Sequence, residues 1–283
     1  MKTVNSLSGG KTSSYIAVKY PADYNVFALV RTNDKKCLYP DKKIRKEVSE
    51  RIGQEFIGTL EQDNVIQIIL DLEQKIGSKI HWTTGITFDE VIRTKGGWLP
   101  NKLHRYCTTN VKIIPLFHWW YKTIREPVEM RIGFRANEMR RAKNMISKLN
   151  KNGLLEIKET VSKNKNGTNH WQIFEWQKPV FPLIDDLIYK DQIEQYWLKN
   201  KDVRFEKGYY NNCVGCFHRN PLFLKKMWEK HPNKMEWFSK QEQGRKKDTW
   251  RPGIKYAQIN KMKKQTEIDF DDFSECDSGY CGI

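Results

Sequence analysis

The chain has 283 residues, of which 39% are hydrophobic and 12% aromatic, so it can bury a substantial core as one large domain or one domain with an appendage. No apolar run approaches the ~20 residues of a membrane-spanning helix, and residues 1–5 lead directly into a glycine turn, so we expect a cytoplasmic protein without signal peptide. A net charge of +16 favours polyanionic partners such as DNA or RNA, although solubility alone could also explain it.

The first fourteen residues predict a strand, a glycine turn and the start of a helix. Gly9 and Gly10 allow successive N–H groups to converge on one oxyanion, and a helix N-terminus behind them favours phosphate. Lys11 adds a positive charge, and hydroxyl donors come from Ser8, Thr12 and Ser13. The turn lacks the first glycine of a Walker loop. It therefore predicts a different phosphate-binding turn, with a plain strand-to-helix connection as the alternative.

Alternating strands and helices follow the turn. We expect a buried strand over residues 25–30 that ends in a polar segment at 31–34, a helix at 42–52, and a third strand at 65–70. This order predicts an α/β fold with a parallel sheet, whose ligands bind at the carboxyl ends of the strands. The end of the second strand should then lie beside the first turn.

A cysteine precedes the next predicted helix, which covers residues 111–124 and has Pro115 within its first turn. Thr108 or Thr109 can cap this helix. Cys107 would lie just before the helix N-terminus, where the pKa of a thiol falls, so it suits a thiolate ligand or a nucleophile. Arg105 and Lys112 flank it as candidate anion-binding residues.

A fourth strand, predicted over residues 128–134, ends in a charged segment. Gly133 is followed by Arg135, Glu138, Arg140 and Arg141. Guanidinium groups grip tetrahedral oxyanions with two parallel hydrogen bonds. The segment therefore predicts a phosphate or sulfate clamp at the end of this strand.

Residues 154–176 interrupt the alternation with a hairpin centred on Asn166-Gly167. We interpret it as a cover for the core, although its aromatic residues beside Lys158, Lys163 and Lys165 could stack on bases. Residues 181–184 should then return to the sheet edge, and a helix is expected at 190–199. We expect one nucleotide-binding α/β domain over residues 1–200.

The C-terminal part, residues 201–283, should be helical and end in an acidic tail. Asn220-Pro221 starts a predicted helix that continues to Lys230, and another begins near Asn233. Residues 201–260 hold 14 Lys and Arg against 6 Asp and Glu, whereas residues 261–283 hold 3 against 6. This basic segment carries several Trp and Phe residues, as nucleic-acid-binding segments do, although aromatics at helical spacing are more often part of a core.

Five of the six cysteines form a candidate metal or redox site. Cys213 and Cys216 are three residues apart with a glycine between them, and Cys107 adds a third thiolate. The tail offers Cys276 and Cys281. Three interpretations remain open. The first is a [4Fe–4S] cluster held by Cys107, Cys213, Cys216 and a tail cysteine such as Cys281. The second is a zinc ion with the same ligands, and the third is free thiols without a metal.

The turn at residues 8–13 resembles the pyrophosphate loop (PP-loop), Ser-Gly-Gly-x-Asp-Ser, of the N-type ATP pyrophosphatases, with Thr12 in place of aspartate. The segments Arg105–Thr108, Lys112–Pro115 and Gly133–Glu138 resemble the phosphoadenosine phosphosulfate (PAPS) reductase-like branch, notably its members from phage and mobile elements. The resemblance implies the Rossmann-like fold of adenine-nucleotide α-hydrolases and ATP or a PAPS-like nucleotide. Adenosine would contact Thr32 and Asn33. A Mg²⁺ ion would lack the carboxylate that the loop aspartate supplies in the family, because Thr12 replaces it.

The resemblance also implies sulfur chemistry. The two candidate reactions are reduction of an activated sulfate, and adenylation of a nucleic acid followed by sulfur insertion. Lys11, Cys107 and Arg135 would be catalytic, Arg140 and Lys112 would stabilise charge, and Cys276 would correspond to the nucleophile of a C-terminal Glu-Cys-Gly segment. A sulfur-donor or electron-donor protein is then an expected partner. The alternative function is a non-catalytic nucleic-acid-binding protein with a structural zinc site.

Overall fold

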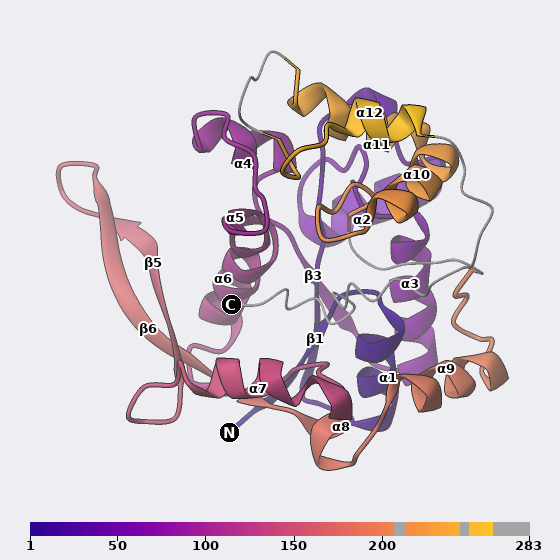
Figure 1. The fold of residues 1–283 in the computed structure, drawn as a ribbon. Coiled ribbons are helices and arrows are strands. Elements are labelled where there is room, and N and C mark those ends of the chain that lie inside the picture. Colours follow the sequence, from indigo (N-terminus) through magenta and orange to yellow (C-terminus); the bar gives the residue numbers. More distant parts are fainter. Residues whose placement is uncertain (207–212, 244–248, 263–283) are drawn as a thin grey trace.

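The computed structural model describes residues 1–206, 213–243 and 249–262, and it confirms the predicted α/β fold (Figure 1). The described part has a six-stranded sheet with the strand order β3-β2-β1-β4-β6-β5. Neighbouring strands are parallel except for β5, which is antiparallel to β6. The strands are β1 (Thr3–Leu7), β2 (Tyr24–Ala28), β3 (Ile80–Thr83), β4 (Val128–Arg131), β5 (Leu155–Lys163) and β6 (Asn169–Val180).

Helices cover both faces of this sheet. The α-helices are α1 (Lys11–Lys19), α2 (Lys42–Ile52), α3 (Asn64–Ile76), α4 (Phe88–Thr94), α5 (Tyr106–Thr108), α6 (Ile114–Thr123), α7 (Met139–Ile146), α8 (Pro182–Asp185), α9 (Lys190–Lys199), α10 (Pro221–Lys230), α11 (Pro232–Gln241) and α12 (Tyr256–Lys261). Two short 3-10 turns, η1 (Lys35–Cys37) and η3 (Ala136–Glu138), and a π-helical turn, η2 (Thr109–Ile113), complete the elements. No helix of the described residues is long and apolar enough to cross a bilayer.

The strand order creates a crevice beside β1. The chain passes from β1 to β2 on one side, and it later adds β4 on the other side of β1, where Asn5 lies opposite Arg131. In open α/β sheets, ligands bind where the strand order reverses in this way, outside the carboxyl ends of the strands. The segments that follow β1 and β4 therefore share the position at which this fold binds a ligand.

Side chains of the strands alternate between two cores. Val26 faces a core that contains Phe117 of α6, whereas its neighbour Phe27 faces a core that contains Ile66 and Ile69 of α3. All five side chains are at most 1% exposed. This period of two, with helices on either side, fixes the sheet as the middle layer.

The predicted third strand is wrong. Residues 65–70 belong to α3, whose buried residues Val65, Ile66, Ile69 and Leu72 recur at helical spacing. Gly77, with φ of 62°, ends this helix in the left-handed conformation. The true third strand, β3, lies further along the chain and has only four residues. A short apolar run fits a buried helix as well as a buried strand, and the helix length decides between them.

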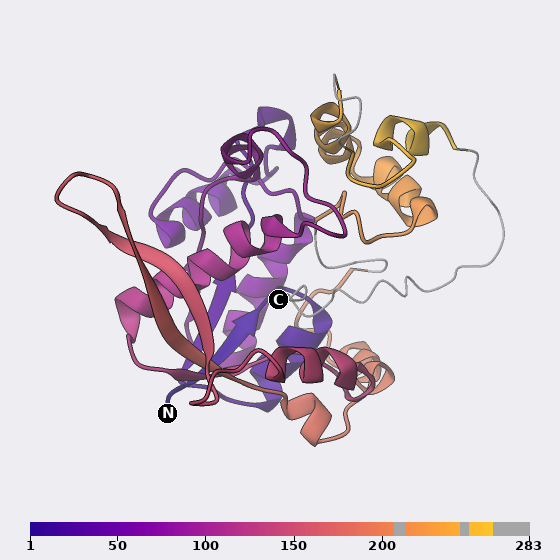
Figure 2. The ribbon, with the colours of Figure 1, turned by 60° about the vertical axis from the view of Figure 1, so that its left-hand side comes forward.

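The predicted hairpin is present, but its second strand is part of the main sheet. β5 and β6 are joined by a turn at Asn166-Gly167, and β6 continues to Val180, where it pairs in parallel with β4. Residues 181–184 therefore do not rejoin the sheet edge, since Pro182 starts α8. The distal part of the hairpin projects from the rest of the molecule in both views (Figures 1 and 2).

The C-terminal helices α10, α11 and α12 lie together at the top of Figure 1. Asn220 caps α10 through a bond from Phe223 N–H to its side chain, as the sequence predicts. These helices share a third core with α4 and residues 99–111. Val214 N–H also donates to Leu60 C=O at 2.8 Å. The helical region is thus continuous in packing with residues 1–200, and the predicted acidic tail lies outside the described residues.

Candidate functional site

The turn after β1 is a tight glycine turn that leads directly into α1. Gly9 adopts a φ of 75°, which favours glycine, and Gly10 is the N-cap of α1. Ser13 Oγ accepts a hydrogen bond from Ser8 N–H at 3.2 Å, lies 3.0 Å from Ser8 Oγ and donates to Gly10 C=O at 3.1 Å. Gly10 has no side-chain oxygen to cap α1, so the N–H groups of its first turn lack a capping side chain.

The loop is held from α9. Lys11 Nζ forms an ion pair with Glu194, and Trp197 Nε1 donates to the Lys11 C=O at 2.9 Å. The Lys11 side chain is 30% exposed, so a bound phosphate would compete with Glu194 for its ammonium group. Thr12, which stands where the loop aspartate is expected, is buried in the same turn.

The segment after β4 forms the other side of the crevice. Gly133 is buried and leads into Arg135, whose backbone N–H and Nε both donate to Glu138 Oε2, at 3.0 and 2.9 Å. Arg141 pairs with the other oxygen of Glu138, and its guanidinium lies 4.3 Å from the ring centroid of Phe134. The Glu138 carboxylate thus fixes two guanidinium groups near the end of β4.

The two adjacent arginines of the predicted clamp have different environments. Arg140 is exposed, whereas Arg141, at i+3 from Glu138, contacts the acid. The i to i+3 spacing explains the difference, because residues three apart lie on the same face of a helix.

Thr32 and Asn33 lie after β2 and contact the N-terminus of α4. Thr32 is buried, and its hydroxyl donates to Asp89 Oδ2 at 2.8 Å. Asn33 is exposed; its N–H donates to the same oxygen at 3.2 Å, and its side-chain amide reaches Thr87 at 3.4 Å. The Thr32 hydroxyl is therefore used within the protein, and Asn33 is the exposed member of the pair.

Cys107 lines one cavity of about 40 Å³ together with the distant pair Cys213 and Cys216. Cys107 comes from α5, and Cys213 and Cys216 form a tight turn in which Cys216 N–H donates to Cys213 C=O at 3.0 Å. Arg105, Lys112 and His218 are also among the lining residues. The structure thus brings together the three cysteines that the sequence singled out. The other two, Cys276 and Cys281, lie outside the described residues.

The expected activation of Cys107 is not found. Cys107 lies within α5, and Thr108 and Thr109 continue the helical segment instead of capping it. Burial, followed by the neighbouring Cys216, raises the pKa of Cys107 to about 11. Burial likewise raises the pKa of Cys213. Desolvation therefore works against ionisation of both thiols.

A buried ion pair borders this cavity. Lys112 Nζ lies 2.9 Å from Glu61 Oε1, and the two side chains are 15% and 2% exposed. Burial alone would lower the pKa of Lys112, but Glu61 more than offsets this, and the pKa is raised. Glu61 also forms an isolated antiparallel bridge with Cys213. Glu61 was missed in the sequence, because nothing in its loop marks it as the partner of a lysine 51 positions later.

The residue types that line the cavity suit a thiophilic metal, but their present arrangement does not form a metal site. Thiolates and imidazole are the usual ligands of zinc, and thiolates hold iron–sulfur clusters. His218 Nε2 is buried with no hydrogen-bond partner in the described part of the chain, and burial lowers the pKa of this histidine to about 4. No group of three or more His, Cys, Asp or Glu among the described residues is arranged to hold a metal ion.

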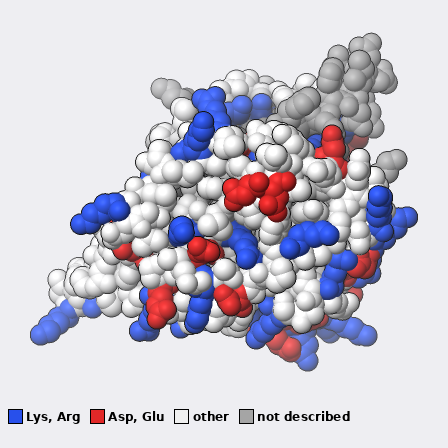
Figure 3. All heavy atoms as spheres, turned by 90° about the horizontal axis from the view of Figure 1, so that it is seen from below, with Lys and Arg blue, Asp and Glu red and all other residues white. Residues whose placement is uncertain are grey.

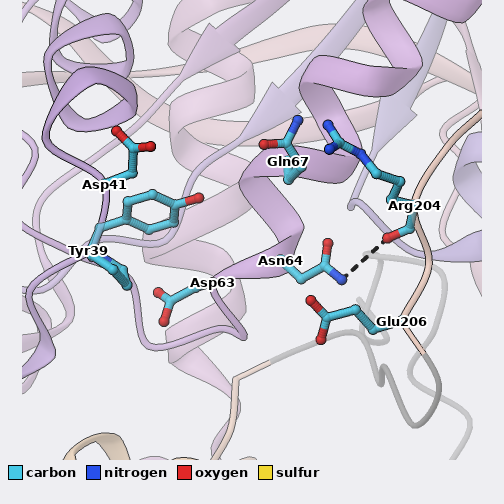
Figure 4. Close-up of a pocket in the computed structure, with 8 residues that line it drawn as sticks. Tyr39, Asp41, Asp63, Asn64, Gln67, Arg204 and Glu206 are labelled. Atoms are coloured by element: carbon cyan, nitrogen blue, oxygen red, sulfur yellow. Dashed lines mark hydrogen bonds between the residues drawn. The ribbon is translucent and has the colours of Figure 1, made fainter.

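A larger hollow, of about 360 Å³, lies between residues 39–41, the start of α3 and the segment after α9 (Figure 4). Asp41 accepts hydrogen bonds from the first turn of α2, Asp63 accepts one from Lys234, and Arg204 binds Asp71. Burial, followed by Asp63 and Asp41, raises the pKa of Tyr39 to about 12. With these carboxylates and Glu206 around it, the hollow does not suit phosphate groups.

No protein-family model matches the chain, and no curated protein matches it significantly.

Proposed function

We propose that this chain is a PAPS reductase-like enzyme of the PP-loop superfamily, which binds an adenine nucleotide and carries out sulfur chemistry. The observation that supports it best is the strand order. The glycine loop and the Arg135 segment follow the two strands that flank the reversal point, which is where this fold binds ligands.

The phosphates of the nucleotide would lie on the loop. The first-turn N–H groups of α1 and the hydroxyls of Ser8 and Thr12 are the donors on one side. Arg135 and Arg141 are the cations on the other side, oriented in advance by Glu138, so they can stabilise developing negative charge at little reorganisation cost. A Mg²⁺ ion would need a carboxylate from outside the loop, because Thr12 supplies none.

The sulfur chemistry would take place at the cavity of Cys107, Cys213 and Cys216. Arg105 and Lys112 line the same cavity, and they would favour thiolates or an anionic sulfur species once a metal or substrate is bound. A [4Fe–4S] cluster or a zinc ion could use these three thiolates, with His218 or a tail cysteine as a fourth ligand. A bound metal would lower the pKa of the thiols and hold them together.

Nucleotide binding can be tested with two glycine variants of equal backbone cost. Gly9→Ala places a side chain at a φ of 75° in the loop, whereas Gly53→Ala does so at 67° at the end of α2, where nothing lies within 4 Å of the added carbon. We expect Gly9→Ala to weaken ATP or PAPS binding by about tenfold or more in titration calorimetry, since the loop is distorted, and Gly53→Ala to leave it unchanged. The nucleotide that binds more tightly separates the two candidate reactions. Unchanged affinity in Gly9→Ala, or no binding of either nucleotide by the native protein, would refute the proposal.

The metal can be tested after anaerobic purification, by metal analysis and absorption spectroscopy. A brown protein with a broad visible band indicates iron–sulfur, and a colourless protein with bound zinc indicates a structural ion. Cys213→Ser should abolish either metal. Cys37→Ser is the matched control, because Cys37 is buried outside the cavity with its thiol 3.9 Å from Asn233 C=O. Native protein that contains neither metal would leave only the free-thiol interpretation.

A further inference from the structure

The two halves of the β5–β6 hairpin have different environments. Near the sheet, Phe174 packs on α6, with its ring centroid 5.1 Å from that of Phe117, and Trp176 is 1% exposed. Further out, Trp171 and Ile173 are 53% and 66% exposed. Both views show this outer half extending beyond the rest of the chain (Figures 1 and 2). The sequence led us to expect a cover for the core, which holds only for the inner half.

The outer half has an unusual composition. Residues 160–173 contain no Asp or Glu, and they carry Lys163, Lys165 and His170. Their other polar side chains are amides and hydroxyls, from Thr160, Ser162, Asn164, Asn166, Thr168, Asn169 and Gln172. By contrast, on the face of the molecule in Figure 3, Lys and Arg are interspersed with Asp and Glu. The outer half of the hairpin, residues 160–173, therefore has basic side chains and no acidic ones.

One face of the outer hairpin combines apolar and basic groups. Trp171 pairs across the strands with Thr160, and Ile173 pairs with Lys158, which is exposed. Directly opposed residues of an antiparallel pair point to the same side of the ribbon. Two large exposed hydrophobic side chains beside lysine amines would be costly on a bare surface, and they mark a contact surface for a partner.

We propose that this outer hairpin inserts into the major groove of double-stranded DNA. The groove of B-form DNA admits a two-stranded β-ribbon, and asparagine and glutamine are side chains that read base edges there. Apolar side chains can contact thymine methyl groups, and Lys163 and Lys165 can neutralise phosphates. Double-stranded RNA does not fit, because its major groove is too narrow for side chains.

The dimensions and the charge agree with this occupant. A strand rises by about 3.3 Å per residue, so the residues from Thr160 to Asn164 reach about 13 Å, compared with a groove depth of about 8.5 Å. The outer half carries Lys163, Lys165 and His170 and no carboxylate, which suits a polyanion such as DNA. DNA binding by the outer hairpin does not depend on the nucleotide site of the proposed function. If both hold, DNA is the macromolecule that the hairpin brings to that site.

The test is fluorescence anisotropy with a labelled DNA duplex over a series of salt concentrations. The variant Lys163→Gln/Lys165→Gln should bind about tenfold more weakly, and its slope of log affinity against log salt should fall by about two, one for each lost phosphate contact. Trp171→Ala should weaken binding with no change in this slope. Lys42→Gln/Lys43→Gln is the control, because it removes the same charge from exposed positions on α2 and should change neither quantity.

Circular dichroism and the thermal midpoint should match the native protein in all three variants, because every changed side chain is exposed. Equal losses in the hairpin and control variants would show that only net charge matters, and would overturn the proposal. Tighter binding of single-stranded DNA or of duplex RNA than of duplex DNA would overturn it as well. Gly9→Ala should keep full DNA affinity, so failure of the nucleotide site and failure of this surface are distinguishable.

Discussion

Lys112→Met should destabilise the protein strongly, because it would leave Glu61 as a buried carboxylate without its cation. The ammonium lies 2.9 Å from Glu61 Oε1, the Glu61 side chain is 2% exposed, and its other oxygen has no hydrogen-bond partner among the described residues. Removing one partner of such a pair costs about 3–5 kcal/mol of unfolding free energy. Glu61→Leu, which leaves the ammonium group beside the cavity, should cost a similar amount.

The double variant Lys112→Met/Glu61→Leu should recover most of this loss, since an apolar pair avoids the desolvation of both charges. Urea unfolding followed by tryptophan fluorescence measures all four corners of this cycle. Lys46→Met is the control, because the Lys46–Glu50 pair spans 3.9 Å with side chains 82% and 67% exposed, and its loss should cost less than about 0.5 kcal/mol. A Lys112→Met loss below about 1 kcal/mol, or a double loss equal to the sum of the single losses, would refute the reasoning.

Three further predictions concern stability. Gly215→Ala should lower the unfolding free energy by about 1–3 kcal/mol in urea titrations, because its added carbon would lie 2.4 Å from the Phe238 ring; full native stability would contradict this packing. Stability should fall as the pH drops from 6.5 toward 4. Burial, followed by Lys234 and other basic neighbours, lowers the pKa of His231 in the folded protein to about 4. Between these pH values the unfolded chain therefore binds a proton that the folded protein does not, which favours unfolding. Urea midpoints at pH 7 and 5 should therefore differ less in His231→Asn than in the native protein, and an equal difference would exclude His231 as a cause. Thr87→Ala should cost about 1 kcal/mol in the same assay and Thr87→Ser much less, because the Thr87 hydroxyl and the Glu90 carboxylate form the capping box of α4.

Local signals in the sequence predicted much of the fold. The helix at residues 190–199 has the expected bounds, and α10 begins at Pro221 after its Asn220 cap. The glycine loop also follows a strand and opens a helix, as the sequence predicts. The predictions of these elements were correct because each element is determined by residues within one or two helical turns of it.

The errors arose where tertiary contacts decide the outcome. The apolar run at 65–70 is helical because it packs its buried stripe against the sheet, and β6 is long because β4 offers it a parallel partner. The candidate site shows the same limit. The cysteines could be grouped from sequence, but the burial that raises the pKa of Cys107, and the Glu61 carboxylate that pairs with Lys112 at the cavity, follow only from the packed structure.

The anchoring of the glycine loop has a consequence for the order of events during synthesis. Lys11 is separated from its contacts Glu194 and Trp197 by 183 and 186 positions, and β1 gains its β4 neighbour only when residues 128–131 have been made. A nascent chain that leaves the ribosome can therefore form the loop early but cannot fix it until α9 has emerged. The loop should therefore reach its native, anchored form late in translation, after about two thirds of the polypeptide has been assembled.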